Sequence, residues 1–146
     1  MTHAEPVPPD DSYLRSLVEA TADAVAAAEP LSSPHTGADE ATRAEVTAAV
    51  ERSSPDLVAL SQDLHAHPEE GFAEHRSVGA LAELLHRHGH EATIGVGGLD
   101  TALRVSTPPR DGPHIAVLAE YDALPGLGHA CGHNVICTTA AGGFLG

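Results

Sequence analysis

The sequence contains no lysine, and its seven arginines stand against 21 aspartates and glutamates, which gives a net charge of −14 with histidine neutral. Binding to phosphate or to anionic lipid needs clustered basic side chains, so the composition argues against nucleic-acid and membrane partners. The longest apolar runs, such as residues 24–28 and 115–119, are too short to span a bilayer. The acidic, proline-rich start of the chain lacks the basic and apolar segments of a signal peptide, so we expect a cytoplasmic protein.

Aromatic residues and cysteines are also scarce. Tryptophan is absent and only two Tyr and two Phe are present, so the core must be built from Ala, Leu, Val and Ile. The two cysteines, Cys131 and Cys137, are expected to be free thiols or metal ligands rather than a disulfide framework. Histidine is abundant by contrast, since nine of the 11 fall between His65 and His133.

Composition and periodicity divide the chain into three parts. Residues 1–11 are acidic and proline-rich and are expected to form a disordered tail. Residues 12–52 predict two helices, over 12–29 and 39–52, on either side of a segment rich in Pro and Ser.

Within residues 53–146 the spacing of the apolar residues changes along the chain, from a helical pattern to a strand-like one and back. The predicted elements are a helix from Pro55 that ends before Pro68, a helix from about Ala73 to Gly89, two strands over 92–96 and 101–105 that could form a hairpin, a buried strand over 114–119, and a helix that starts near Val135. This order favours an α/β layer protein, in which sites lie at the carboxyl ends of strands. A buried strand needs neighbours on both sides, so we interpret the chain as the front part of a larger protein.

Residues 120–134 follow the predicted buried strand and hold the densest group of reactive side chains. Cys131 and His133 flank one glycine, and thiolate and imidazole are both ligands of zinc and similar ions. The alternative is a small buried thiol beside a surface histidine, which the spacing alone favours. Asp122 and Glu120 stand at the strand's end, where a carboxylate could orient a metal-bound histidine; for Asp122 a turn or helix cap is as well supported.

A second cluster lies around the end of the helix that Pro68 terminates. For His65 and His67, interaction with the last helical carbonyls is favoured over metal ligation. Glu74 is equally well explained as an acid in the first turn of the next helix. Cys137 is expected to pack in the core.

Two motifs then point to a known family. Residues 63–74, DLHAHPEEGFAE, resemble the N-terminal signature of the aminoacylase and carboxypeptidase family of metallopeptidases, the M-twenty peptidases. Residues 118–125, LAEYDALP, and 128–134, GHACGHN, resemble its amidohydrolase branch. The Glu-Tyr-Asp-Ala-Leu-Pro form is most similar to the aminobenzoyl-glutamate hydrolase and β-alanyl-lysine-type dipeptidase subgroup. The resemblance covers roughly residues 53–145.

The resemblance implies a fold and a chemistry. The fold is an α/β/α zinc-exopeptidase-like sandwich, of which residues 53–146 would be the incomplete N-terminal part, preceded by the helices of residues 12–52. The lid domain, through which full-length relatives form homodimers, would be absent. Two divalent ions (zinc, manganese or cobalt) would activate water to cleave the amide bond of N-acyl or aminobenzoyl amino acids or small dipeptides.

The same resemblance assigns residues to the site. Cys131 would be the bridging or shared metal ligand, His133 a terminal ligand, and Asp122 an acid that supports the metal site. The general-base Glu and the further ligands lie downstream in relatives, so we expect this chain to be inactive by itself. The alternative is a non-catalytic truncated remnant, or a binding module that retains the front half of the fold.

Overall fold

The computed structural model describes residues 10–28 and 32–146, so most of the predicted tail lies outside the described residues. The chain divides into two compact units, residues 1–37 and 38–146. The first unit contains helix α1, Ser12–Ala27, which confirms the first predicted helix. The Asp10 carboxylate accepts hydrogen bonds from the amide and the hydroxyl of Ser12, at 2.9 and 3.0 Å, whereas the N-cap residue Asp11 makes no side-chain cap hydrogen bond. No helix of the described residues is long and apolar enough to cross a membrane.

The second unit begins with helix α2, Glu40–Ala66, whose first turn is capped by Asp39 accepting from the Thr42 amide at 2.7 Å. The prediction of two helices, divided before Pro55, was wrong, because the helix continues through Pro55. A proline removes one helical hydrogen bond, so a helix is predicted to start at a proline or to end before it. Here the helix is supported by tertiary packing on both sides of Pro55, because the last residues of the chain lie close to Val50 before the proline and to Leu57 after it.

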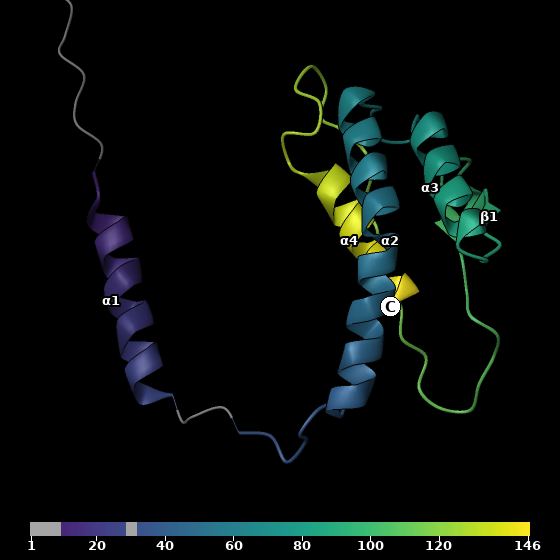
Figure 1. The fold of residues 1–146 in the computed structure, drawn as a ribbon. Helices are drawn as coiled ribbons and strands as arrows, with labels where there is room; N and C mark the ends of the chain where they lie inside the picture. Colours follow the sequence, from purple (N-terminus) through teal and green to yellow (C-terminus); the bar gives the residue numbers. More distant parts are fainter. Residues whose placement is uncertain (1–9, 29–31) are drawn as a thin grey trace, which may run out of the picture. The chain divides into compact units, whose positions relative to one another are not determined.

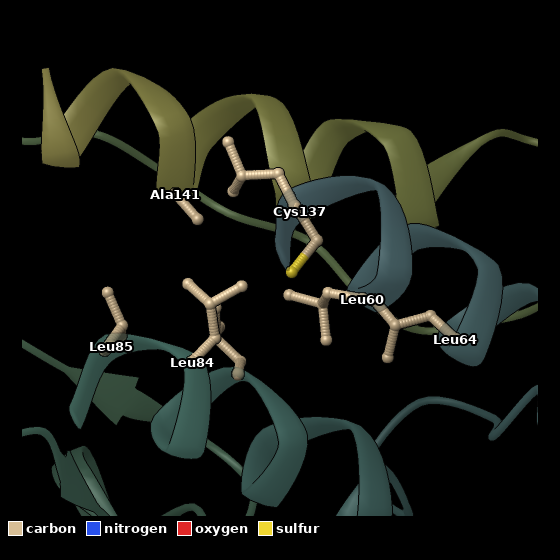
Figure 2. Packing of buried hydrophobic residues seen from close by; sticks show 8 residues of the cluster. Leu60, Leu64, Leu84, Leu85, Cys137 and Ala141 are labelled. Carbon is tan, nitrogen blue, oxygen red and sulfur yellow. The ribbon is translucent and has the colours of Figure 1, made fainter. Parts of the chain in front are cut away.

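Helix α3, His75–Arg87, and helix α4, His133–Leu145, complete the helical part of this unit. In α3 the apolar residues at helical spacing are the buried ones, Val78, Leu81, Leu84 and Leu85, as the sequence predicts. Figure 1 shows α4 running beside α2. Figure 2 shows Cys137 and Ala141 of α4 directed toward Leu84 and Leu85 of α3, with Leu60 and Leu64 of α2 alongside. Cys137 is fully buried, so its predicted place in the core is confirmed.

The predicted hairpin is present but short. Strand β1, Thr93–Ile94, pairs antiparallel with β2, Leu103–Arg104, so that Ile94 faces Leu103. Between them lies a 3₁₀ turn, η1, over Val96–Gly98. Gly95, Gly97 and Gly98 have positive φ, which ends the extended backbone after two residues.

The buried strand predicted over residues 114–119 was wrong. This segment forms no regular structure, and Ile115 and Leu118 are 86% and 83% exposed. Figure 1 shows the chain between β2 and α4 as a long open loop. A central strand is stable only when strands on both sides satisfy its N–H and C=O groups. The described residues contain a single sheet of two strands, so the fold is mixed α/β and offers this segment no partner.

Candidate metal site

The first motif forms the end of α2 and the turn that leads to α3. The Nδ1 atom of His67 lies 2.9 Å from the Asp63 carbonyl oxygen, so this histidine interacts with the last helical carbonyls as the sequence analysis favoured. His65 is exposed in the final turn of α2. Glu74 immediately precedes α3, but its side chain is buried and does not cap that helix.

Glu69 caps α3 in place of Glu74. Its two carboxylate oxygens accept hydrogen bonds from the Arg76 amide at 3.0 Å and from the amide and hydroxyl of Ser77, both at 2.7 Å. Burial acts to raise the pKa of Glu69, but these hydrogen bonds and the nearby His75 outweigh it and lower the pKa. The carboxylate therefore replaces the missing cap at the start of α3.

Backbone contacts join the first motif to the second. The Ala123 amide donates to the Glu69 carbonyl at 2.7 Å, and Glu70 and Ala123 form an isolated parallel bridge. Pro68 lies against Gly128. At the start of α4, the side-chain amide of Asn134 donates to the carbonyl and hydroxyl oxygens of Ser61 in α2, at 3.2 and 3.1 Å. Two segments more than fifty residues apart are thus fixed against each other.

At this junction His133 meets a carboxylate at each ring nitrogen. Asp122 Oδ1 lies 2.7 Å from Nδ1, and Glu120 Oε2 lies 3.3 Å from Nε2. An ionised carboxylate only accepts hydrogen bonds, so the Asp122 contact requires the proton to be on Nδ1. In the neutral ring Nε2 then carries a lone pair that faces the Glu120 carboxylate, which is also an acceptor. The contact between Nε2 and this carboxylate is favourable only when a proton or a metal ion lies between the two atoms.

Gly132 precedes this histidine and shapes the loop. It adopts a left-handed conformation, φ 78°, which starts α4 at His133. Cys131, on the other side of the glycine, is a free and exposed thiol, whereas burial raises the pKa of Cys137 to about 12. Within residues 10–28 and 32–146, no three His, Cys, Asp or Glu side chains converge where they could hold a metal ion. Cys131 and His133 are donors of a type that suits zinc, but the described residues do not complete a metal site around them.

The sequence analysis gave no role to His129, which is buried in the same loop. It is 8% exposed, and neither ring nitrogen has a hydrogen-bond partner of ordinary geometry. Burial lowers its pKa, and a charge on His65 would lower it further, so the ring is held neutral. No local pattern indicated this, because its burial depends on the packing of the second motif against the end of α2.

No family model matches the chain. Among curated proteins it is 38% identical over 106 residues to the Xaa-Arg dipeptidase of Mus musculus, covering 66% of this chain and 25% of the relative. It is 32% identical over 109 residues to one of the subunits of the p-aminobenzoyl-glutamate hydrolase of Escherichia coli, covering 63% of this chain and 22% of the relative. It is 31% identical over 108 residues to the N-acyl-L-amino acid amidohydrolase of Geobacillus stearothermophilus, covering 64% and 29%.

The chain thus spans about a quarter of the length of the curated relatives that it matches. The relatives carry names of dipeptidases, amidohydrolases and a carboxypeptidase, and they are M-twenty proteins. The structure adds that both motifs behind the resemblance meet at one place, through the contact of Ala123 with Glu69. Over about two thirds of its length, this chain is therefore homologous to metallopeptidases and amidohydrolases of the M-twenty family.

Proposed function

We propose that this chain is part of a metal-dependent amidohydrolase or peptidase that cleaves the amide bond of N-acyl or aminobenzoyl amino acids or of small dipeptides. The observation that carries the proposal is the contact of Asp122 with Nδ1 of His133, two residues after an exposed thiol. A histidine that binds a metal usually donates its other N–H to a carboxylate, which fixes the tautomer and makes the ring more basic. The names of the relatives support the reaction class.

In this proposal Cys131 and His133 are metal ligands and Asp122 supports His133. The donor chemistry fits zinc, manganese or cobalt, and the contact of Nε2 with the Glu120 carboxylate is favourable when a metal ion or a proton lies between them. A bound divalent ion would supply Lewis-acid polarisation of the amide carbonyl and a more acidic water. Asp122 keeps the proton on Nδ1, and Gly132 lets the two donors stand on one tight turn.

We further propose that the complete site holds two ions and draws its other ligands and its general base from outside these residues. The observation behind this is that no three His, Cys, Asp or Glu side chains converge on a metal site among the residues described. The chain alone is then inactive. In the complete enzyme, this chain would form part of an α/β/α sandwich, and a lid domain would form a homodimer. The two free thiols support the cytoplasmic location expected from the sequence.

Zinc titration of the purified chain by calorimetry tests the ligand assignment. We expect binding that Cys131→Ser and His133→Gln abolish and that Asp122→Asn weakens by about 10–100-fold. His114→Gln is the matched control, because His114 lies in the exposed loop, and it should bind zinc like the parent. Zinc binding that survives both ligand substitutions would contradict the proposal. Absence of zinc binding in the parent would favour a non-catalytic remnant or binding module.

A hydrolysis assay tests the second part of the proposal. The chain is incubated with zinc, manganese or cobalt and with N-acetyl amino acids, aminobenzoyl-glutamate or dipeptides. We expect no metal-dependent release of amino acid, because the described residues hold no group of three side chains that could bind a metal ion. Turnover that depends on the added metal and on Cys131 would show that the chain is sufficient, and would refute its proposed inactivity.

A further inference from the structure

Tyr121 stands between the two acids that contact His133, but its side chain is bound elsewhere. Its hydroxyl donates to the backbone carbonyl of Thr101, and the Thr101 hydroxyl donates to Glu74 Oε2 at 2.6 Å. Thr101 and Glu74 are 6% and 8% exposed, so this chain of hydrogen bonds is buried. Burial, with contributions from Glu74 and Cys137, raises the pKa of Tyr121 to about 12, so the hydroxyl keeps its proton and remains a donor.

The acids on either side of Tyr121 are much less constrained by themselves. The side chains of Glu120 and Asp122 are 59% and 36% exposed. Short-range contacts between partly exposed charged groups are weak when the side chains must also lose rotamer freedom to make them. Asp122 nevertheless reaches His133 in one defined geometry, 2.7 Å from Nδ1. Its backbone must therefore be held by neighbouring parts of the fold.

Two fixed points bracket Asp122. On its C-terminal side, the Ala123 amide is bonded to the Glu69 carbonyl at 2.7 Å. On its N-terminal side, Tyr121 packs against the hydrophobic core and bonds to Thr101. The first point comes from the turn before α3, and the second comes from the loop of the β1–β2 hairpin. Asp122 is thus held between two segments that are remote from it in sequence.

We propose that Tyr121 is a positioning residue whose hydroxyl, held by Thr101, sets the orientation of Asp122 toward Nδ1 of His133. Thr101 and Glu74 extend this support into the buried part of the molecule. The inference deepens the proposed function, since it concerns the same histidine. It also gives Glu74 of the first motif a role: its buried carboxylate fixes the Thr101 hydroxyl and does not itself reach the site.

The test is the Nδ1–H tautomer population of His133, measured by ¹⁵N NMR of the imidazole in the metal-free chain. Tyr121→Phe removes the hydroxyl and keeps the ring in the core, so we expect the Nδ1–H fraction to fall while the fold is retained. Tyr13→Phe is the matched control, because it makes the same change at the exposed tyrosine of α1 and should leave the fraction unchanged. Thr101→Ser, which keeps the hydroxyl, should also leave it unchanged, and Thr101→Val should lower it.

Zinc affinity gives a second readout. Tyr121→Phe should lose part of the roughly 10–100-fold expected for Asp122→Asn, and combining the two substitutions should cost no more than Asp122→Asn alone. If Tyr121→Phe lowers the melting temperature but leaves both the tautomer fraction and the zinc affinity at parent values, the hydroxyl is merely structural and the inference is overturned. If the parent binds no zinc, the proposed function fails, while the tautomer measurement still decides the inference.

Discussion

The capping of α3 by Glu69 gives a stability prediction that can be worked out from individual hydrogen bonds. Three donors, the amides of Arg76 and Ser77 and the Ser77 hydroxyl, bond to its two carboxylate oxygens. Glu69→Gln keeps the shape but replaces one oxygen by an NH₂ group, which would face a donor. One helix amide is then left without a partner, and the remaining bonds lose their charge.

The expected cost follows from the class of these bonds. Losing a helix N-cap costs about 0.5–2 kcal/mol, and a net hydrogen bond to a charged group contributes about 1.5–3 kcal/mol. Because Glu69 is only partly buried, we expect a loss near the lower part of that range, about 1–2 kcal/mol, at neutral pH. Glu70→Gln is the matched control, because it makes the same change at the neighbouring exposed position, and it should stay within about 0.5 kcal/mol.

Urea unfolding of the parent and both variants, followed from neutral to acid pH, provides the assay. The pKa of Glu69 is lowered in the folded state. Its contribution is therefore fully present above the unfolded-state pKa of about 4.3 and is lost as the pH falls through the lower folded-state pKa. The difference between parent and Glu69→Gln should narrow in that range. Equal stabilities at neutral pH, or a difference that does not change in acid, would refute this explanation of the cap.

Three further predictions concern the core and α4. Cys131 should react rapidly with a thiol reagent, whereas Cys137, fully buried and with a pKa of about 12, should react only after unfolding; equal rates in the folded chain would contradict the described core. Leu84→Ala should cost about 2–5 kcal/mol in urea unfolding, because Leu84 is 1% exposed among other leucines, and a loss near zero would be inconsistent with that packing. Gly143→Ala should increase the free energy of unfolding by about 0.5–1 kcal/mol and so raise the melting temperature, because the position is helical, exposed and has room for a Cβ. Gly142→Ala should gain less or destabilise, because its Cβ would lie 3.1 Å from Leu57.

Local sequence predicted the elements whose stability is local. The stripe of apolar residues in α3 and the glycine-separated hairpin appear where periodicity placed them. It failed at Pro55 and at residues 114–119, for opposite reasons. At Pro55, contacts from α4 on both sides maintain a helix that the proline should interrupt. At 114–119, apolar residues suited to a strand find no strand to pair with in the described residues.

At the candidate site, too, local sequence indicated the residue types but not the long-range contacts. The sequence marked Asp122, Cys131 and His133 through residue type and spacing, and the structure places Asp122 at Nδ1 of His133. The metal-ligand role of the cysteine and the histidine stays a prediction. The sequence analysis missed the long-range contacts, because no periodic or motif signal links the Thr101 carbonyl to Tyr121 or indicates that His129 of the second motif is buried.

Cobalt binding followed by absorption spectroscopy tests the central claim most directly, because a thiolate bound to cobalt gives a charge-transfer band that imidazole and carboxylate do not. We predict that the chain develops this band with Co²⁺, that zinc displaces it, and that Cys131→Ser and His133→Gln abolish it. Cys137→Ala, which changes the buried thiol instead, should retain the band. No band in the parent, or a band that persists without Cys131, would contradict the assignment of Cys131 and His133 as ligands of one metal ion.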